Sequence, residues 1–75
     1  MGRIPQISGK DAVKAFEKLG YRAVRQRGSH IRLWPQSGSA GKALTIPDHH
    51  IVGKGLLRKL IRDAEISVDE FLNLL

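Results

Sequence analysis

The amino-acid sequence predicts an α+β fold in which helices flank a small antiparallel sheet. Segments 9–19 and 54–64 repeat apolar residues at helical spacing, whereas segment 30–34 alternates apolar and polar residues as a strand does. Three predicted strands follow one another with short links, which favours antiparallel pairing. Each long helix has one apolar stripe, so both helices are expected to cover a common face of the sheet.

The first helix is predicted over Gly9–Leu19, because Ser8 and Asp11 form a capping-box-like start and Gly20 suits its end. One side of this helix is apolar. A separate stripe is basic and consists of Lys10, Lys14 and Lys18. The expected first strand is Tyr21–Arg27, and Gly28-Ser29 is typical of a two-residue hairpin turn.

The second strand, His30–Trp34, has the clearest alternation in the chain. Ile31 and Leu33 point one way and are expected in the core, which leaves His30, Arg32 and Trp34 on the uncovered face.

The remaining segments complete an α-β-β-β-α order with a short helix at the end. A loop, Pro35–Lys42, contains Gly38 and Ser39, and a third strand is expected over Lys42–Ile46, where Pro47 stops it. The second helix is predicted over Lys54–Ala64, with an apolar stripe made of Leu56, Leu57, Leu60, Ile61 and Ala64. Ser67 and Glu70 form a capping box for a last helix, Val68–Leu75. We expect one domain spanning residues 1–75. Double-stranded-RNA-binding domains have the same order, although a shared fold does not establish function.

Composition points to a phosphate-bearing partner. The 75 residues carry a net charge of +6, and eight basic but only two acidic residues lie between Met1 and Trp34. Lysine and arginine that contact phosphate release condensed counterions, so such a region favours nucleic acid. The absence of cysteine excludes disulfides and thiolate metal sites. With no candidate signal peptide or membrane span, a cytoplasmic protein that does not contact membranes is expected.

His30 is the first candidate for chemistry. Imidazole titrates near neutral pH, so it can act as a general acid or base, and RNA carries its own nucleophile in the 2′-hydroxyl. The arginines nearby, among them Arg25, Arg27 and Arg32, could hold the phosphate and stabilise its charge. The alternative is a surface histidine without a function.

Several other residues remain open. His49 and His50 could bind a metal, hold their loop, or supply a second acid or base, and the loop role is favoured because H-E-x-x-H spacing is absent. Lys54, between Gly53 and Gly55, either starts a helix or contacts an RNA phosphate. Ser29 beside His30 lacks an oriented acid partner for nucleophilic catalysis. Tyr21 and Trp34 either stack on bases or fill the edge of the core.

Three segments of the chain resemble the HicA-type (YcfA-like) toxins of bacterial toxin–antitoxin pairs. The resemblance covers nearly the whole chain and rests on three segments in order: ISGKDAVKAFEKLGY (7–21), VRQRGSHIRL (24–33) and TIPDHHIVGKGLLRKLIRDAEIS (45–67). The glycine that usually follows the second helix is replaced by Glu65, which is expected to cost up to about 1 kcal/mol at a left-handed position.

The resemblance implies a function and its partners. Such a chain would be the toxin of a type II system, a metal-independent endoribonuclease with a double-stranded-RNA-binding-like fold that cleaves messenger RNA. Its catalytic histidine would be the one in the Gly-Ser-His turn, His30, and it would need no cofactor. A HicB-type antitoxin would bind the toxin, block its site and provide most of the contact with operon DNA. We expect RNA contacts from Lys10, Lys14, Arg25, Arg27, Ser29, Arg32 and Lys54, with His49 as a possible second catalytic group.

Two other classes of function stay open on the residues alone. A non-catalytic RNA-binding module would use the same basic face for affinity only. A basic adaptor for an acidic protein would bind RNA poorly and would not distinguish RNA from DNA.

Overall fold

A computed structural model describes residues 3–36 and 41–75 of the chain. The elements are α1 (Gly9–Leu19), β1 (Tyr21–Arg27), β2 (His30–Pro35), β3 (Leu44–Pro47), α2 (Lys54–Asp63) and α3 (Val68–Leu72). This order confirms the predicted α+β fold. Gly38 and Ser39 of the predicted loop lie outside the described residues. No helix in the two described ranges is long and apolar enough to cross a membrane.

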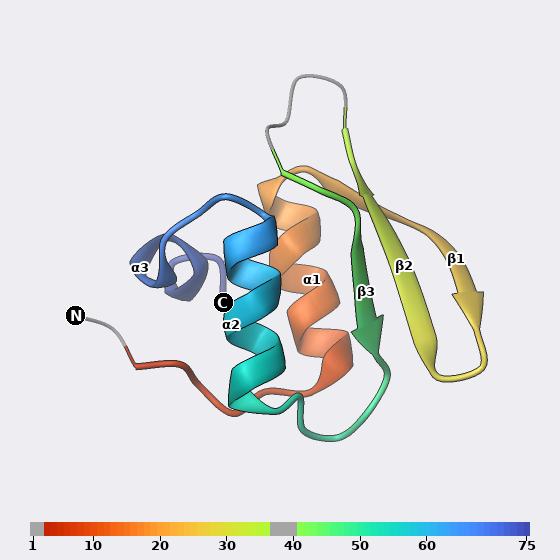
Figure 1. The fold of residues 1–75 in the computed structure, drawn as a ribbon, viewed down its shortest axis with the longest axis horizontal. Coiled ribbons are helices and arrows are strands. Elements are labelled where there is room, and N and C mark those ends of the chain that lie inside the picture. The colour runs from red at the N-terminus through yellow and green to blue at the C-terminus, as the bar shows by residue number, and fades with distance from the viewer. Residues whose placement is uncertain (1–2, 37–40) are drawn as a thin grey trace.

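The three strands form one antiparallel sheet with the order β1-β2-β3. Figure 1 shows α1 and α2 side by side against one face of this sheet, with α3 on the far side of α2. None of the helices in residues 3–36 and 41–75 lies on the opposite face, as the sequence predicted. The β1–β2 turn and the connection from β3 to α2 lie at the same end of the molecule.

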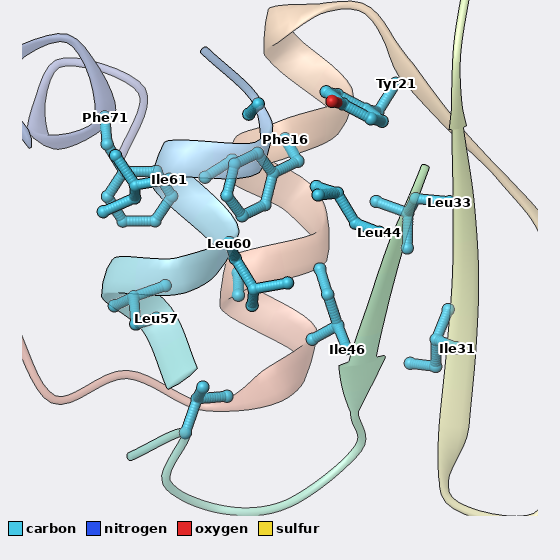
Figure 2. Packing of buried hydrophobic residues seen from close by; sticks show 14 of the residues in the cluster. Phe16, Tyr21, Ile31, Leu33, Leu44, Ile46, Leu57, Leu60, Ile61 and Phe71 are labelled. Carbon is cyan, nitrogen blue, oxygen red and sulfur yellow. The ribbon is translucent and has the colours of Figure 1, made fainter. Parts of the chain in front are cut away.

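The hydrophobic core lies between the sheet and the helices. Ile31 and Leu33 of β2 point into it, and Leu60 of α2 and Ile46 of β3 point toward each other (Figure 2). Phe16 of α1 packs edge-on against Tyr21 and at a tilt against Phe71 of α3. The sequence-predicted stripe of α2 is confirmed except for Leu56, which is 37% exposed. The buried side of α2 is filled by the other four residues of the stripe, which keep helical spacing without Leu56: Leu57, Leu60, Ile61 and Ala64.

Local capping signals set the helix ends. The Ser8 hydroxyl accepts a hydrogen bond from the Asp11 amide at 3.0 Å, and Gly20 follows α1 with a φ of 121°. Ser67 and Glu70 form the reciprocal capping box of α3. Gly53, before α2, provides no side chain to cap that helix.

Glu65 confirms the expectation of a left-handed residue after α2, with a φ of 59°. The amide of Glu65 donates to the Arg62 carbonyl, and the amide of Ile66 donates to the Ile61 carbonyl. This pair of bonds defines a Schellman motif, whose left-handed position is normally occupied by glycine. A side chain there is strained because its Cβ approaches the following carbonyl.

Five boundaries differ from the sequence prediction, and the first is the end of β2, which includes Pro35. β3 starts at Leu44 rather than at Lys42, because the Lys42 amide donates to the Asp63 carbonyl at the end of α2. β3 also includes Pro47, which pairs with His30. Helix α2 ends at Asp63 and α3 ends at Leu72, one and three residues before the predicted ends.

Candidate functional site

The uncovered face of the sheet gathers basic side chains around His30. In β2, His30, Arg32 and Trp34 are exposed, whereas Ile31 and Leu33 between them are buried. Cross-strand partners in an antiparallel ladder lie on the same face of the sheet. The register pairs His30 with Arg27, Arg32 with Arg25, and Trp34 with Arg22. Three arginines of β1 are therefore on the same face as His30.

A β-bulge in β1 makes this arrangement possible. The ladder shifts between Ala23 and Arg25, so Val24 is the extra residue. Strict alternation from the buried Tyr21 would have turned Arg25 and Arg27 toward the helices. The extra residue reverses that alternation and returns both arginines to the open face. The sequence analysis did not detect the bulge, and its only local sign is the weak alternation of Tyr21–Arg27.

The open face contains a shallow pocket of about 700 Å³. It is lined by Val24, Arg25, Arg27, His30, Arg32, Trp34 and Thr45. No carboxylate is among these lining residues, so the pocket suits an anion. The guanidinium of Arg32 donates to the Thr45 hydroxyl at 2.8 Å, which orients this arginine across β2 and β3. Val24 and Thr45 were not singled out from the sequence.

The imidazole of His30 is exposed in this pocket. Within the described part of the chain, no hydrogen bond or ion pair involves its two nitrogens. Both nitrogens are therefore available to a bound molecule, one to accept a proton and one to donate.

Backbone contacts on both sides fix the turn before His30. Gly28 has a φ of 58°, which suits the first central position of a type II′ turn. The Gln26 side-chain amide donates to the Gly28 carbonyl at 3.2 Å, and the Asp48 amide donates to the Ser29 carbonyl at 2.6 Å. Ser29 itself is exposed in the turn and does not line the pocket.

His49 and His50 line a different depression, together with Ser8, Lys10 and Asp48. It shares no residue with the pocket of His30, so the structure does not bring His30 and His49 into one pocket. The His49 carbonyl accepts a hydrogen bond from the Gly9 amide at 2.9 Å, which joins this loop to the start of α1. The described residues contain no group of three histidine or acidic side chains placed to hold a metal ion.

The lysines predicted to contact RNA are dispersed. Lys14 and Lys18 line a depression beside Leu74 and Leu75. Lys54 lies beside Arg3 and Arg58 at the start of α2. Only Arg25, Arg27 and Arg32 of the predicted basic contacts share the pocket with His30.

The two candidate stacking residues, Tyr21 and Trp34, differ in burial. Tyr21 is buried, and its hydroxyl donates to the Lys42 carbonyl at 2.7 Å. Burial raises the pKa of Tyr21, and the negative charges of Asp63 and Glu65 raise it further. Tyr21 is therefore a core residue. Trp34 is 54% exposed and lines the pocket of His30.

Comparisons with known proteins bear on the family to which the chain belongs. No match was found among curated proteins. A protein-family model described as "HicA toxin of bacterial toxin-antitoxin" matches residues 9–66, which include α1, the whole sheet, the Gly-Ser-His turn and α2. Membership of this family implies a HicB-type antitoxin as the partner. The chain therefore belongs to the family of HicA toxins of bacterial toxin–antitoxin systems.

Proposed function

We propose that this toxin is an endoribonuclease that cleaves messenger RNA in the cytoplasm and that His30 is its catalytic residue. The observation that carries the proposal is the position of His30. Its imidazole is exposed in a pocket with three arginines and no carboxylate. A phosphodiester placed there would meet a proton-transfer group and positive charge together, which is the combination that phosphate cleavage requires.

The chemistry uses the nucleophile of the RNA itself. His30 accepts the proton of a 2′-hydroxyl while its oxygen forms a bond to the adjacent phosphorus. The bond from phosphorus to the 5′ oxygen breaks, and that oxygen takes its proton from solvent water, because the pocket lining includes no carboxylate and no second histidine. The products are a 2′,3′-cyclic phosphate and a free 5′-hydroxyl, so no metal or cofactor enters the balance.

The arginines stabilise charge on the phosphate. Negative charge builds on its oxygens as the new bond forms, and preorganised cations lower the energy of that state. Arg25, Arg27 and Arg32 line the pocket, and a planar guanidinium can bind two phosphate oxygens at once. The hydrogen bond from Arg32 to Thr45 preorganises one of the three.

The antitoxin acts on the same face. A HicB-type partner that covers the open sheet face would exclude RNA from His30, and contact with operon DNA would come through the antitoxin. Lys10, Lys14, Ser29 and Lys54 lie outside the pocket, so any RNA contact of theirs belongs to parts of the substrate away from the cleaved bond.

The test compares His30→Ala with His50→Ala, since His50 is also exposed but lies in the other depression. Purified toxin, free of antitoxin, is incubated with RNA and with a DNA copy in the presence of a chelator. We expect His30→Ala to lose roughly 10²–10⁴-fold in cleavage rate. Its RNA affinity should persist because a neutral imidazole adds little to phosphate binding. His50→Ala should cleave like the wild type, and DNA should stay intact.

A non-catalytic RNA-binding module is the second candidate. It is favoured by one observation: His30 is the only histidine among the pocket's lining residues, and none of the others is a carboxylate. If wild type and His30→Ala bind RNA equally and neither cleaves it, the chain is such a module and the nuclease proposal is wrong.

A further inference from the structure

Trp34 is an exposed aromatic side chain in the same pocket as His30. It is 54% exposed and Val24 beside the same pocket is 52% exposed, whereas the aromatic rings of Phe16, Tyr21 and Phe71 are buried. Exposing an indole to water forgoes the stabilisation that its burial would give. Leu33 and Pro35, on either side of Trp34, belong to the same strand. Alternation along β2 therefore places the Trp34 side chain on the open face.

Resting on the nuclease function proposed above, we propose that Trp34 stacks on an unpaired base of the RNA, next to the cleaved bond. The substrate would then be single-stranded at that nucleotide. Trp34 would act as a binding and specificity residue, and His30 would keep the chemistry.

The spacing along β2 supports this assignment. Residues i, i+2 and i+4 of a strand lie on one face, separated by about 6.6 Å for each step of two. Arg32 therefore lies between His30 and Trp34, which are about 13 Å apart along the strand. A strand of RNA could place its phosphate near His30 and Arg32 while a neighbouring base reaches the indole.

The charge around Trp34 favours nucleic acid over an apolar protein segment. Arg22 is its cross-strand partner, and Arg25 and Arg32 line the same pocket. Alternating cations and aromatic faces are typical of grooves that bind single strands, where the cations follow the backbone and the aromatics stack on bases. Sheets with exposed aromatics bind unpaired bases in the same way. In a duplex the faces of the bases are covered by their neighbours, so a paired base cannot stack on Trp34.

The chain reports on this contact directly, because Trp34 is its only tryptophan. The probe is a short single-stranded oligoribonucleotide with 2′-O-methyl groups, which the toxin cannot cleave. We expect it to quench the fluorescence of Trp34. The same strand annealed to its complement, and a strand of equal length with abasic sites in place of bases, should bind through charge without comparable quenching.

Variants of Trp34 test how much the indole contributes to RNA affinity. Trp34→Ala should bind the single-stranded probe about tenfold more weakly, because the stacking of a base on the aromatic ring is lost. Trp34→Phe should recover part of the affinity, since it restores an aromatic face. Ile51→Ala is the matched control, because Ile51 is 56% exposed but lies outside the pocket. Fluorescence anisotropy of a labelled probe measures all four proteins.

Three outcomes would overturn the inference. Equal quenching by duplex and single strand would show that no unpaired base is needed. Unchanged affinity in Trp34→Ala would show that the indole does not stack. Loss of antitoxin binding in Trp34→Ala with RNA binding intact would show that the indole contacts the antitoxin and not an RNA base. Because the probe cannot be cleaved, the result does not depend on nuclease activity, and failure of cleavage by the wild type would count against the proposed function only.

Discussion

The two faces of the sheet have opposite characters although the same strands form both. The covered face of β2 presents Ile31 and Leu33, which pack with Leu44, Ile46 and the helices. The open face presents His30, Arg32 and Trp34, joined across the ladder by arginines of β1. Adjacent residues of one strand thus belong separately to the core and to the candidate site.

This difference teaches that a chain of 75 residues can present a candidate site on one face of a sheet while the other face forms its core. A chain of this size buries only about 60% of the surface that it exposes when unfolded, so it has little apolar area to spare for an enclosed active site. The open face needs no such area, because the covered face alone holds the sheet to the helices. Substitutions on the two faces should therefore have separable effects.

The largest expected effect is on the covered face. Leu33 is fully buried, so Leu33→Ala leaves a cavity and should lower the free energy of unfolding by about 2–5 kcal/mol. Its neighbour Trp34 is the matched control, and Trp34→Ala should change stability by much less. Urea denaturation followed by circular dichroism measures both. Similar losses in the two variants would contradict the separation of the faces.

An intermediate effect is expected for the cations of the open face. Arg27→Gln should weaken RNA binding by about 1.5 kcal/mol, because a charge-assisted hydrogen bond to phosphate is lost. The slope of log affinity against log salt should also become shallower by about 0.7 if one single-strand phosphate contact is removed. Arg58→Gln on α2 is the control, since Arg58 is exposed away from the pocket. If both variants change the slope equally, RNA contacts the surface around Arg58 as much as it contacts the open face of the sheet.

The smallest effect is expected at Glu65, which belongs to neither face. Glu65→Gly should raise the free energy of unfolding by about 0.5–1 kcal/mol, because glycine accepts a positive φ without strain. Glu65→Ala removes the same charge but keeps a Cβ, so it should gain less. Urea midpoints decide between them, and RNA cleavage should be unaffected in both. An equal gain in the free energy of unfolding for Glu65→Ala would show that the charge of Glu65, and not its backbone conformation, lowers the stability.

Much of the fold could be predicted because its signals are local. Ser8, Gly20 and the Ser67–Glu70 pair determine helix ends through bonds that span only three or four residues. The alternation in His30–Trp34 separated the two faces of β2 before any contact was known. The left-handed residue after α2 was expected from the family resemblance, in which glycine usually stands where this chain has Glu65, and the Schellman hydrogen bonds are found there.

The candidate site could be predicted only in part. His30, Arg25, Arg27 and Arg32 do share one pocket, but Lys10, Lys54 and His49 line others. Proximity in sequence does not determine which surface depression a side chain lines. That depends on how α1 and α2 are oriented against the sheet.

The sequence by itself determined which residues have apolar and polar periodicity, where each helix starts, and that His30 follows a tight turn. Only the tertiary structure decided the rest. The bulge at Val24 depends on the ladder with β2, and it alone brings Arg25 and Arg27 to the face of His30. The burial of Tyr21 depends on which face the helices cover. The physical reason is range: caps and turns are made by neighbours in the chain, whereas a strand's facing residues are set by partners that are distant in sequence.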